Sequence, residues 1–335
     1  MNTCYIPQGY KPFLTTYQTQ QAIGRLKRVF EDNLSMALNL HRASAPLFVE
    51  PQTGLNDNLT GIERPVEFDV PGTKGTAEIV HSLAKWKRMA LHKYGFPEGA
   101  GIYTDMNAIR RDEMLDNTHS IYVDQWDWEV VITKQQRTEE FLKHTVKRIV
   151  ESIYETSVRL RWDYPELPVS LNPEVTFITA QELEDLYPSL SPEEREHEFA
   201  KEHKTVFVSK IGGQLRSGGR HGVRAPDYDD WNLNGDILFW HEILGCALEL
   251  SSMGIRVDEE ALLAQLKDAG CENRKTLSFH KALLTGQLPL TMGGGIGQSR
   301  LCMLLMAKAH IGQVQVSVWD EKTQEICNAN GVVLL

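Results

Sequence analysis

The chain has 335 residues, 41% of them hydrophobic and 24% charged, and its 35 basic and 45 acidic side chains give a formal net charge of −10. A chain with this composition can bury a large core, which excludes intrinsic disorder. The acidic balance argues against general binding to nucleic acid or to an anionic membrane surface, because both need a basic face.

Apolar spacing and turn signals predict the elements of the first 131 residues. They are a helix over 15–36, a hairpin of strands 65–70 and 76–81, a helix over 83–94, and strands over 101–110 and 119–131. Pro71-Gly72 marks the hairpin turn, and Gly95 is expected to end the second helix.

The rest of the chain predicts further helices and strands. They are helices over 134–160, 259–268, 278–285 and 297–308, strands over 205–211, 236–240, 246–257 and 314–319, and a polar, glycine-rich region over 212–235. Thr179 with Glu182, and Ser191 with Glu194, form capping boxes that start two more helices. Since no strict βαβ rhythm is present, we predict one α+β domain over 1–335, a largely antiparallel mixed sheet flanked by helices.

The five cysteines form no CxxC and have no spacing typical of a metal site, and the N-terminal segment resembles no signal peptide. The longest apolar run near the C-terminus, 301–307, is far too short to cross a membrane. These features predict a reduced, cytoplasmic protein. The P-loop, the dinucleotide-binding glycine pattern, GxSxG and HExxH are all absent from the sequence, which removes the commonest nucleotide and hydrolase motifs.

Four glycines precede Arg300 in the stretch Gly293-Gly294-Gly295-Ile296-Gly297-Gln298-Ser299-Arg300. We expect a strand-to-helix turn here, where a flat ligand lies against bare backbone and the helix N-terminus attracts an anion. Arg300 would then stack on a base or reach a phosphate. The alternative is a tight structural turn with an arginine on the surface.

A second polar group begins at Arg110 and Glu113 and continues along the strand over 119–131. The period of two places Gln125, Asp127 and Glu129 on one face of this strand and the two tryptophans between them on the other. Buried carboxylates are costly unless paired, so a functional pocket explains this face. The alternative is an edge strand with one face in water.

Two acidic residues, Asp236 and Glu249, fall on strands that we expect to be neighbours. Carboxylates placed in this way suit Mg²⁺ bound to a triphosphate. The alternative is one turn aspartate and one structural glutamate.

Three further candidates precede the second helix or lie in it. Asp57 follows an asparagine and is by itself typical of a turn. Ser82 is expected to be the N-cap of the helix, and Lys87 lies within it, where it is either a surface lysine or a ligand for an anion.

Together these groups resemble the catalytic core of class II aminoacyl-tRNA synthetases, aspartyl and asparaginyl members above all. Longer strings resemble the ammonia-dependent asparagine synthetases, the aspartate–ammonia ligases of the asparagine synthetase A type, from about residue 5 to about residue 320. These strings are HSLAKWKR, YVDQWDWE, VRAPDYDDW, NGDIL, ELSSMGIRVD, GGGIGQSR and HIGQVQ.

The resemblance implies an enzyme that makes L-asparagine from L-aspartate, ammonia and ATP, and releases AMP and pyrophosphate. The side-chain carboxylate of aspartate attacks the α-phosphorus of ATP, and ammonia then attacks the β-aspartyl adenylate. It also implies Mg²⁺ on the ATP phosphates, a homodimer, and no partner in nucleic acid or membrane.

Roles carried over from the resemblance, residue by residue, fall into four groups. The catalytic residues are Asp57, which would take a proton from ammonium, with Arg110, Gln125 and Arg300. Aspartate would be bound by Ser82, Lys87, Gln125, Asp127, Ser252 and Gly294. ATP would be bound by Arg110, Glu113, Asp229, Asp236, Glu249, Ser251, Gly295, Gly297 and Arg300, with Mg²⁺ held by Asp236 and Glu249 through the phosphates.

Two other functions stay open at this point. An aminoacylating enzyme like the aspartyl- or asparaginyl-tRNA synthetases is disfavoured by the acidic charge and by the lack of room for an anticodon-binding domain. A non-catalytic regulatory homologue that binds an amino acid or nucleotide is disfavoured because Arg110, Gln125 and Arg300 are all present.

Overall fold

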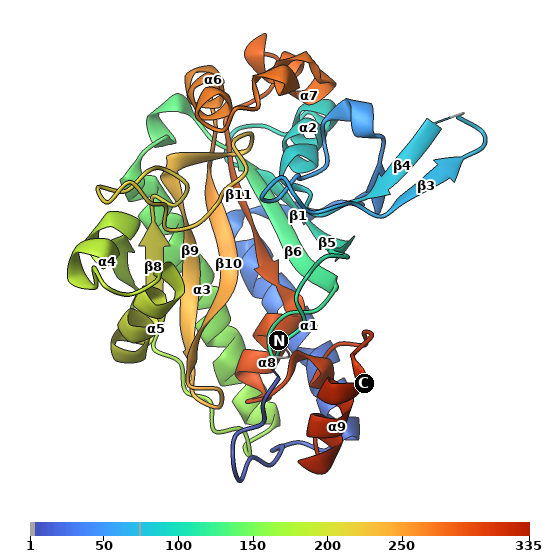
Figure 1. Cartoon of the computed structure of the whole chain (residues 1–335), viewed down its shortest axis with the longest axis vertical. Coiled ribbons are helices and arrows are strands. Elements are labelled where there is room, and N and C mark those ends of the chain that lie inside the picture. Colours follow the sequence, from blue (N-terminus) through green and yellow to red (C-terminus); the bar gives the residue numbers. More distant parts are fainter. Residues whose placement is uncertain (1–3, 74) are drawn as a thin grey trace.

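The computed structural model of the protein describes residues 4–73 and 75–335. Its centre is an eight-stranded sheet with the order β1-β5-β6-β11-β10-β9-β8-β7, and a small sheet of order β2-β4-β3 projects to one side (Figure 1). The pairs β1–β5 and β7–β8 at the edges are parallel, whereas all pairs between β5 and β8 are antiparallel. The predicted fold class is confirmed.

The strands of the large sheet differ widely in length. They are β1 (Leu40–Arg42), β5 (Gly101–Ile109), β6 (Tyr122–Val131), β7 (Thr176–Thr179), β8 (Thr205–Ser209), β9 (Asp229–His241), β10 (Cys246–Arg256) and β11 (Thr291–Gly297). The small sheet consists of β2 (Phe48–Val49), β3 (Glu67–Val70) and β4 (Gly75–Ile79). Pairing of β3 with β4 confirms the predicted hairpin.

Helices cover the sheet and its ends. They are α1 (Thr16–Leu38), α2 (Ala84–Tyr94), α3 (Glu139–Asp163), α4 (Ala180–Leu186), α5 (Pro192–His203), α6 (Glu259–Asp268), α7 (Ser278–Leu284), α8 (Gln298–Leu305) and α9 (Glu321–Ala329). Within the described part of the chain, no helix has the length and apolarity needed to cross a membrane.

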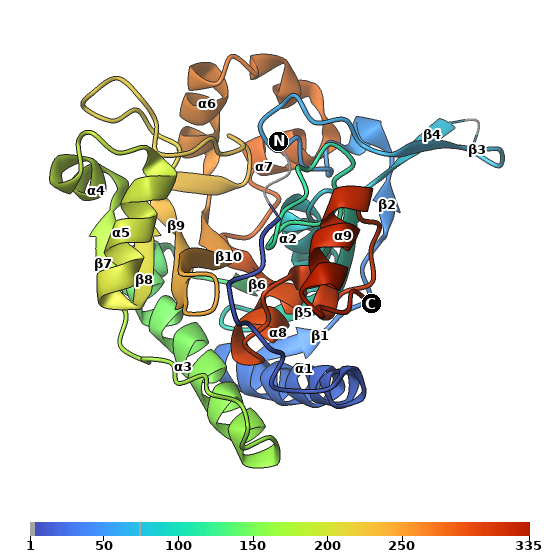
Figure 2. The same cartoon turned by 60° about the horizontal axis from the view of Figure 1, so that its bottom comes forward.

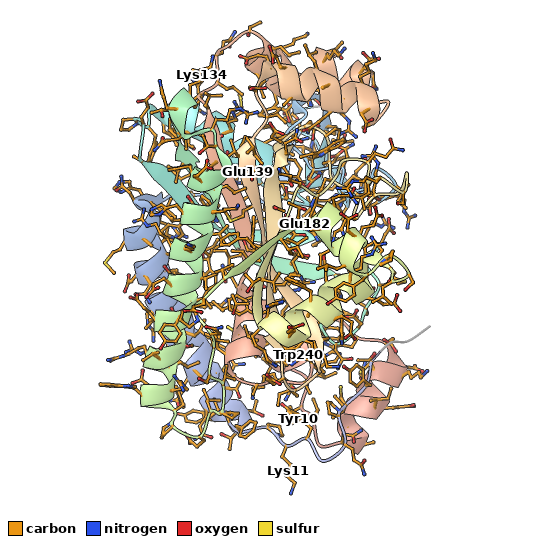
Figure 3. The ribbon with its side chains drawn as sticks, turned by 90° about the vertical axis from the view of Figure 1, so that its left-hand side faces the viewer. Tyr10, Lys11, Lys134, Glu139, Glu182 and Trp240 are labelled. Atoms are coloured by element: carbon orange, nitrogen blue, oxygen red, sulfur yellow. The ribbon has the colours of Figure 1, made fainter. Side chains whose placement is uncertain are left out.

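One face of the sheet is closed by the two longest helices, α1 and α3, which lie side by side beneath it (Figure 2). Figure 3 shows α3 running lengthwise beside the sheet, with Glu139 of its first turn toward the upper end. Apolar residues at helical spacing on both helices pack with Trp126 and Trp128 of β6 in the main core. The side chains of β6 that alternate with these tryptophans therefore point to the opposite face.

Several predicted elements need correction. The glycine-rich stretch 293–297 is not a turn but the end of strand β11, followed directly by α8. The predicted strand over 314–319 is wrong, because a short 3₁₀ helix (Ile311–Gln313) and an extended segment occupy this region. Strand β9 begins at Asp229, inside the region expected to be irregular, and the predicted helix over 134–160 begins as an α-helix only at Glu139. The prediction of one domain over 1–335 stays a prediction.

A buried histidine at the end of β9 links stability to pH. His241 is 1% exposed, and its Nδ1 accepts a hydrogen bond from the backbone N–H of Leu244 at 3.2 Å. Burial lowers the pKa of His241 to about 4, from 6.5 for an ordinary histidine. The unfolded chain therefore binds a proton at a pH where the folded chain does not, so stability falls as the pH drops below 6.5.

We expect this group to lower the free energy of unfolding by about 2 kcal/mol between pH 7.5 and pH 5. Urea unfolding at the two pH values measures the difference. A His241→Asn variant, which keeps an acceptor for Leu244, is expected to lose most of this dependence, whereas His92→Asn at an exposed position keeps it. Equal pH dependence in all three proteins would contradict the prediction.

Candidate active site

A polar cleft opens on the face of the sheet that α1 and α3 leave uncovered. Its floor is formed by β6, β10 and β11, and its walls by chain segments around residues 57–63, 110–120 and 223–229. Every predicted site residue except Asp236 and Ser251 lines it. These lining residues are Asp57, Ser82, Lys87, Arg110, Glu113, Gln125, Asp127, Asp229, Glu249, Ser252, Gly294, Gly295, Gly297 and Arg300.

Strand β6 supplies the polar floor because it is an interior strand, paired with β5 on one side and β11 on the other. Gln125 and Asp127 face the cleft, while Trp126 and Trp128 are completely buried on the other face. The alternative of an edge strand with one face in water is therefore wrong.

The glycines of β11 make room for the side chains of β6. A Cβ on Gly295 would collide with the carboxamide of Gln125, and a Cβ on Gly293 would collide with the carboxylate of Glu129. Because both glycines lack a side chain, these two polar groups can lie flat across the neighbouring strand. The glycines thus make space for side chains of the protein itself. The predicted role, a turn that lets a ligand lie against bare backbone, is different.

Lys87 and Asp127 form a buried ion pair at one end of the cleft. The Nζ of Lys87 donates hydrogen bonds to Asp127 Oδ1 and to the backbone oxygen of Gly294, the latter at 2.9 Å. Asp127 Oδ2 accepts from the backbone N–H of Leu83 at 3.3 Å. Burial lowers the pKa of Lys87, although the charge of Asp127 acts in the opposite direction. Lys87 is therefore not a surface lysine.

The start of α2 differs from the prediction. Its N-cap is Leu83, which provides no side-chain cap, and Ser82 lies one residue earlier, beside the cleft. The Oγ of Ser82 accepts only a 3.4 Å bond from the N–H of Ala84, so most of its hydrogen-bonding capacity is available to a ligand.

Below the ion pair, Arg256 joins two buried carboxylates. Its guanidinium donates to Glu129 at 2.7–3.1 Å and also to Asp229. Glu129 accepts a further bond from Thr291 Oγ1 at 2.6 Å. Burial opposes ionisation of Glu129, but Arg256 and Lys87 hold its pKa below the usual value. Asp229 lines the cleft as predicted, but its carboxylate is already engaged by Arg256.

Two arginines, Arg110 and Arg300, also line the cleft, and both lie near Glu249. Arg300, in the first turn of α8, donates to the backbone oxygens of Glu249 at 2.9 Å and Thr118 at 3.3 Å. Arg110 follows β5, and its buried Nε has no hydrogen-bond partner among the described residues. Such an arrangement is suited to an anion such as a phosphate.

The predicted cation ligands lie on adjacent strands. Glu249 lines the cleft; its burial opposes ionisation, but Arg300, Arg224 and Arg110 lower its pKa. Asp236 is 4% exposed, and its Oδ2 is paired with Arg224. Asp236 Oδ1 is buried and has no hydrogen-bond partner in the described part of the chain. An unpaired carboxylate oxygen beside a second carboxylate fits the oxygen ligands that Mg²⁺ requires.

The two remaining predicted residues, Asp57 and Ser251, are both buried. Asp57 is buried, and its Oδ1 accepts from the N–H of Leu59 at 2.8 Å, which is the turn expected of this sequence. It lines the cleft in addition. Ser251 Oγ is buried without a hydrogen-bond partner among the described residues and does not line the cleft.

Sequence reasoning missed several cleft residues, among them His119, Arg224, Tyr228 and Arg256. They lie in a loop, at the end of a strand or in the segment 223–229. The sequence has no hydrophobic period there that would predict which way a side chain points. For Arg224, Tyr228 and Arg256, the only available signal was their charge or aromatic character within the strings VRAPDYDDW and ELSSMGIRVD, and His119 lies outside both strings.

A second cluster lies outside the cleft. The sulfur atoms of Cys4 and Cys327 and a ring nitrogen of His310 lie within 4.8 Å of one another. However, Nδ1 of His310 accepts the N–H of Gly312 at 3.0 Å, so the neutral ring carries its proton on Nε2. The remaining nitrogen is a donor rather than a metal ligand, and we assign no metal to this cluster.

Comparison with known proteins gives concordant results. The family model described as aspartate–ammonia ligase matches residues 17–331. A protein named aspartate–ammonia ligase from Ruminiclostridium cellulolyticum is 58% identical, with all of both chains covered. One of the same name from Lactobacillus johnsonii is also 58% identical, covering 99% of this chain and 100% of that protein.

Solved structures share the fold at low sequence identity. The asparaginyl-tRNA synthetase of Entamoeba histolytica, in complex with asparaginyl-adenylate, has a TM-score of 0.63 and 14% identity. The match covers 90% of this chain and 66% of that one. The enzyme from Pyrococcus horikoshii has a TM-score of 0.61 and 15% identity over 88% of this chain and 68% of its own.

Proposed function

The chain belongs to the aspartate–ammonia ligase family, and from this premise we propose how its cleft makes asparagine from aspartate, ammonia and ATP. The observation that carries the proposal is the buried pair of Lys87 and Asp127, which opens on the same cleft as Arg110 and Arg300. The cation of this pair can bind the α-carboxylate of an amino acid, and its anion can bind the α-ammonium group. The two arginines can bind the negative oxygens of a phosphate.

Aspartate would bind with its α-carboxylate at Lys87 and Ser82 and its α-ammonium at Asp127. Ser252 and Gly294 border the same end of the cleft. The side-chain carboxylate then points along the floor toward Gln125, which would orient it. Both ligating charges are held by the protein before substrate arrives, so little reorganisation is needed on binding.

In the first step, an oxygen of the side-chain carboxylate attacks the α-phosphorus of ATP, and the bond to the pyrophosphate oxygen breaks. Two anions must approach one another, and negative charge increases on the phosphate oxygens. Arg110 and Arg300 would offset this charge. Glu113, Gly295 and Gly297 line the cleft and are the further residues proposed for the ATP end, whereas the carboxylate of Asp229 is engaged by Arg256 and Ser251 does not line the cleft.

Asp236 and Glu249 would hold Mg²⁺ together with the ATP phosphates, since their oxygens fit that ion. The bound ion would neutralise charge on the triphosphate.

In the second step, ammonia attacks the activated carbonyl carbon, and AMP leaves. Ammonium is not a nucleophile, and most ammonia is protonated at pH 7, so a base must accept a proton. We propose Asp57 for this role, because its buried carboxylate lines the cleft near the segment that carries Ser82.

The experiment is to incubate the protein with Mg-ATP, aspartate and ammonium chloride, and to measure asparagine, AMP and pyrophosphate together. Equal amounts of the three products support the proposal. ADP and phosphate would overturn the adenylate route. Exchange of pyrophosphate into ATP without asparagine would overturn ammonia as acceptor and favour tRNA.

An Asp57→Asn variant separates the two steps. We expect it to retain aspartate-dependent pyrophosphate exchange while asparagine formation at neutral pH falls about 100-fold, as is usual when a general base is lost. Glu63→Gln, on the same wall of the cleft, is the matched control and is expected to leave both rates within a few fold. An equal loss of exchange and amidation would show that Asp57 acts on aspartate or ATP instead.

We also propose the homodimer that the resemblance implies and the cytoplasmic location predicted from the cysteine pattern. Sedimentation of the purified protein at micromolar concentration tests the dimer.

A further inference from the structure

Arg224 pairs with one of the two carboxylates that are proposed to hold the cation and lies near the other. Its guanidinium pairs with Asp236 Oδ2, and its side chain is 21% exposed on the wall of the cleft. Asp236 and Glu249 both raise the pKa of Arg224, against the effect of burial, so both carboxylates lie close to its charge.

A guanidinium and a divalent cation at the same carboxylate repel one another, so the two cations compete for it. Mg²⁺ needs oxygen ligands at about 2.0–2.1 Å. In this structure Arg224 already donates a hydrogen bond to one candidate ligand atom, Asp236 Oδ2. The second oxygen, Oδ1, is buried and has no partner among residues 4–73 and 75–335. Arg224 therefore engages one oxygen of this carboxylate, and within the described part of the chain the other oxygen has no hydrogen-bond partner.

The chain before Arg224 and the chain after it are held in different ways. The segment before it is rich in glycine, and it is held by a β-bridge between Gln214 and Arg220 and by the bond between His221 Nε2 and Glu196 at 2.8 Å. After it, Asp227 is fixed through one carboxylate oxygen by Lys85, His280 and Arg274 at 3.0–3.2 Å. Arg224 therefore lies between two anchored points of the chain, and a change of its partner would come from rotation of its long side chain.

We propose that Arg224 is the counter-ion of Asp236 only in the nucleotide-free enzyme, and that entry of ATP with its divalent cation transfers this guanidinium from Asp236 to the outer phosphates of ATP. Arginine is suited to both partners, because its planar fork binds carboxylates and phosphates alike. The exchange keeps the buried carboxylate neutralised at every stage. This inference rests on the proposed function in that it places Mg-ATP at Asp236 and Glu249.

The test uses Mn²⁺ as a paramagnetic substitute for Mg²⁺, titrated into the nucleotide-free enzyme and followed by electron paramagnetic resonance. An Arg224→Gln variant is expected to bind Mn²⁺ about tenfold more tightly than the unchanged protein, because the competing guanidinium is gone. Adding Asp236→Asn to this variant is expected to abolish the gain, which locates the ion. Unchanged Mn²⁺ affinity in Arg224→Gln would overturn the proposal.

The second readout is ATP binding at equilibrium, measured by calorimetry with Mg²⁺ present. Arg224→Gln is expected to weaken ATP about 10- to 100-fold, the usual effect of losing charge-assisted hydrogen bonds. Tighter Mn²⁺ with unchanged ATP affinity would overturn the transfer to the phosphates.

Two further variants serve as controls. Arg216→Gln lies in the same segment but pairs with Asp185 at 2.9 Å away from the cleft, and it is expected to change neither affinity. Arg224→Lys keeps the charge and folds under the same constraints, so it is expected to bind Mn²⁺ as weakly as the unchanged protein. Because neither readout requires asparagine formation, failure of the proposed function and failure of this inference are distinguishable.

Discussion

An Arg300→Gln variant is expected to lose about 10³-fold in kcat/KM for asparagine synthesis, the loss typical of removing one charged group from a stabilised transition state. Arg300 lies at the start of α8, and its backbone contacts with Glu249 and Thr118 fix its guanidinium over the cleft. Glutamine keeps the polarity of this position but lacks the charge that offsets the phosphate oxygens. Steady-state assays at saturating Mg²⁺ measure the change.

Arg111→Gln is the matched control for this experiment. Arg111 follows Arg110 in the sequence, but its side chain is half exposed and does not line the cleft. We expect its kcat/KM to stay within about twofold of the original, as for a surface substitution. An Arg300→Gln protein that folds normally and retains a tenth or more of the activity would remove Arg300 from the catalytic group.

An Arg256→Met variant is expected to lose about 3–5 kcal/mol of unfolding free energy, because it removes the guanidinium that Glu129 and Asp229 share in the buried region beneath the cleft. All three groups are almost completely buried beneath the cleft. Urea unfolding at pH 7.5 measures the change. Adding Glu129→Gln to this variant is expected to recover part of the loss, since one of the two buried carboxylate charges is then removed.

The control for this prediction is an exposed ion pair. Arg42 and Asp105 approach to 2.8 Å, but their side chains are 58% and 36% exposed. Arg42→Met is therefore expected to cost at most about 1 kcal/mol. Equal effects of the two substitutions would show that the buried network does not stabilise the sheet.

Local sequence signals predicted the regular elements well where the signal was strong. The two capping boxes are present as expected, with Thr179 and Ser191 at the N-caps of α4 and α5. Helix α6 begins and ends at the predicted residues, and the alternation along β6 divides its side chains between core and cleft. These features depend on neighbours in the chain, so a single sequence contains the information.

Other elements depended on distant partners. Four glycines within five residues are typical of a turn, yet residues 293–297 form a strand. Strands β6 and β10 provide hydrogen bonds on both sides, and Gln125 and Glu129 fill the space where side chains would be. Very short strands such as β1 and β2 have too few residues to show a period, and they were missed. The apolar residues near 314–319 lack a neighbouring strand in the described structure.

By itself, the sequence determined the α+β class, the order of most helices and strands, the family, and a set of residues that nearly all prove to share one cleft. It could do so because periodicity, caps and motif strings are properties of adjacent residues. Only the tertiary structure decided which charges are paired. It placed Arg256 between Glu129 and Asp229, buried Lys87 against Asp127, and set Arg224 on Asp236. The physical reason is that the free energy of a buried charge depends on partners brought close by folding, which lie 12 to 127 positions apart along the chain in these pairs.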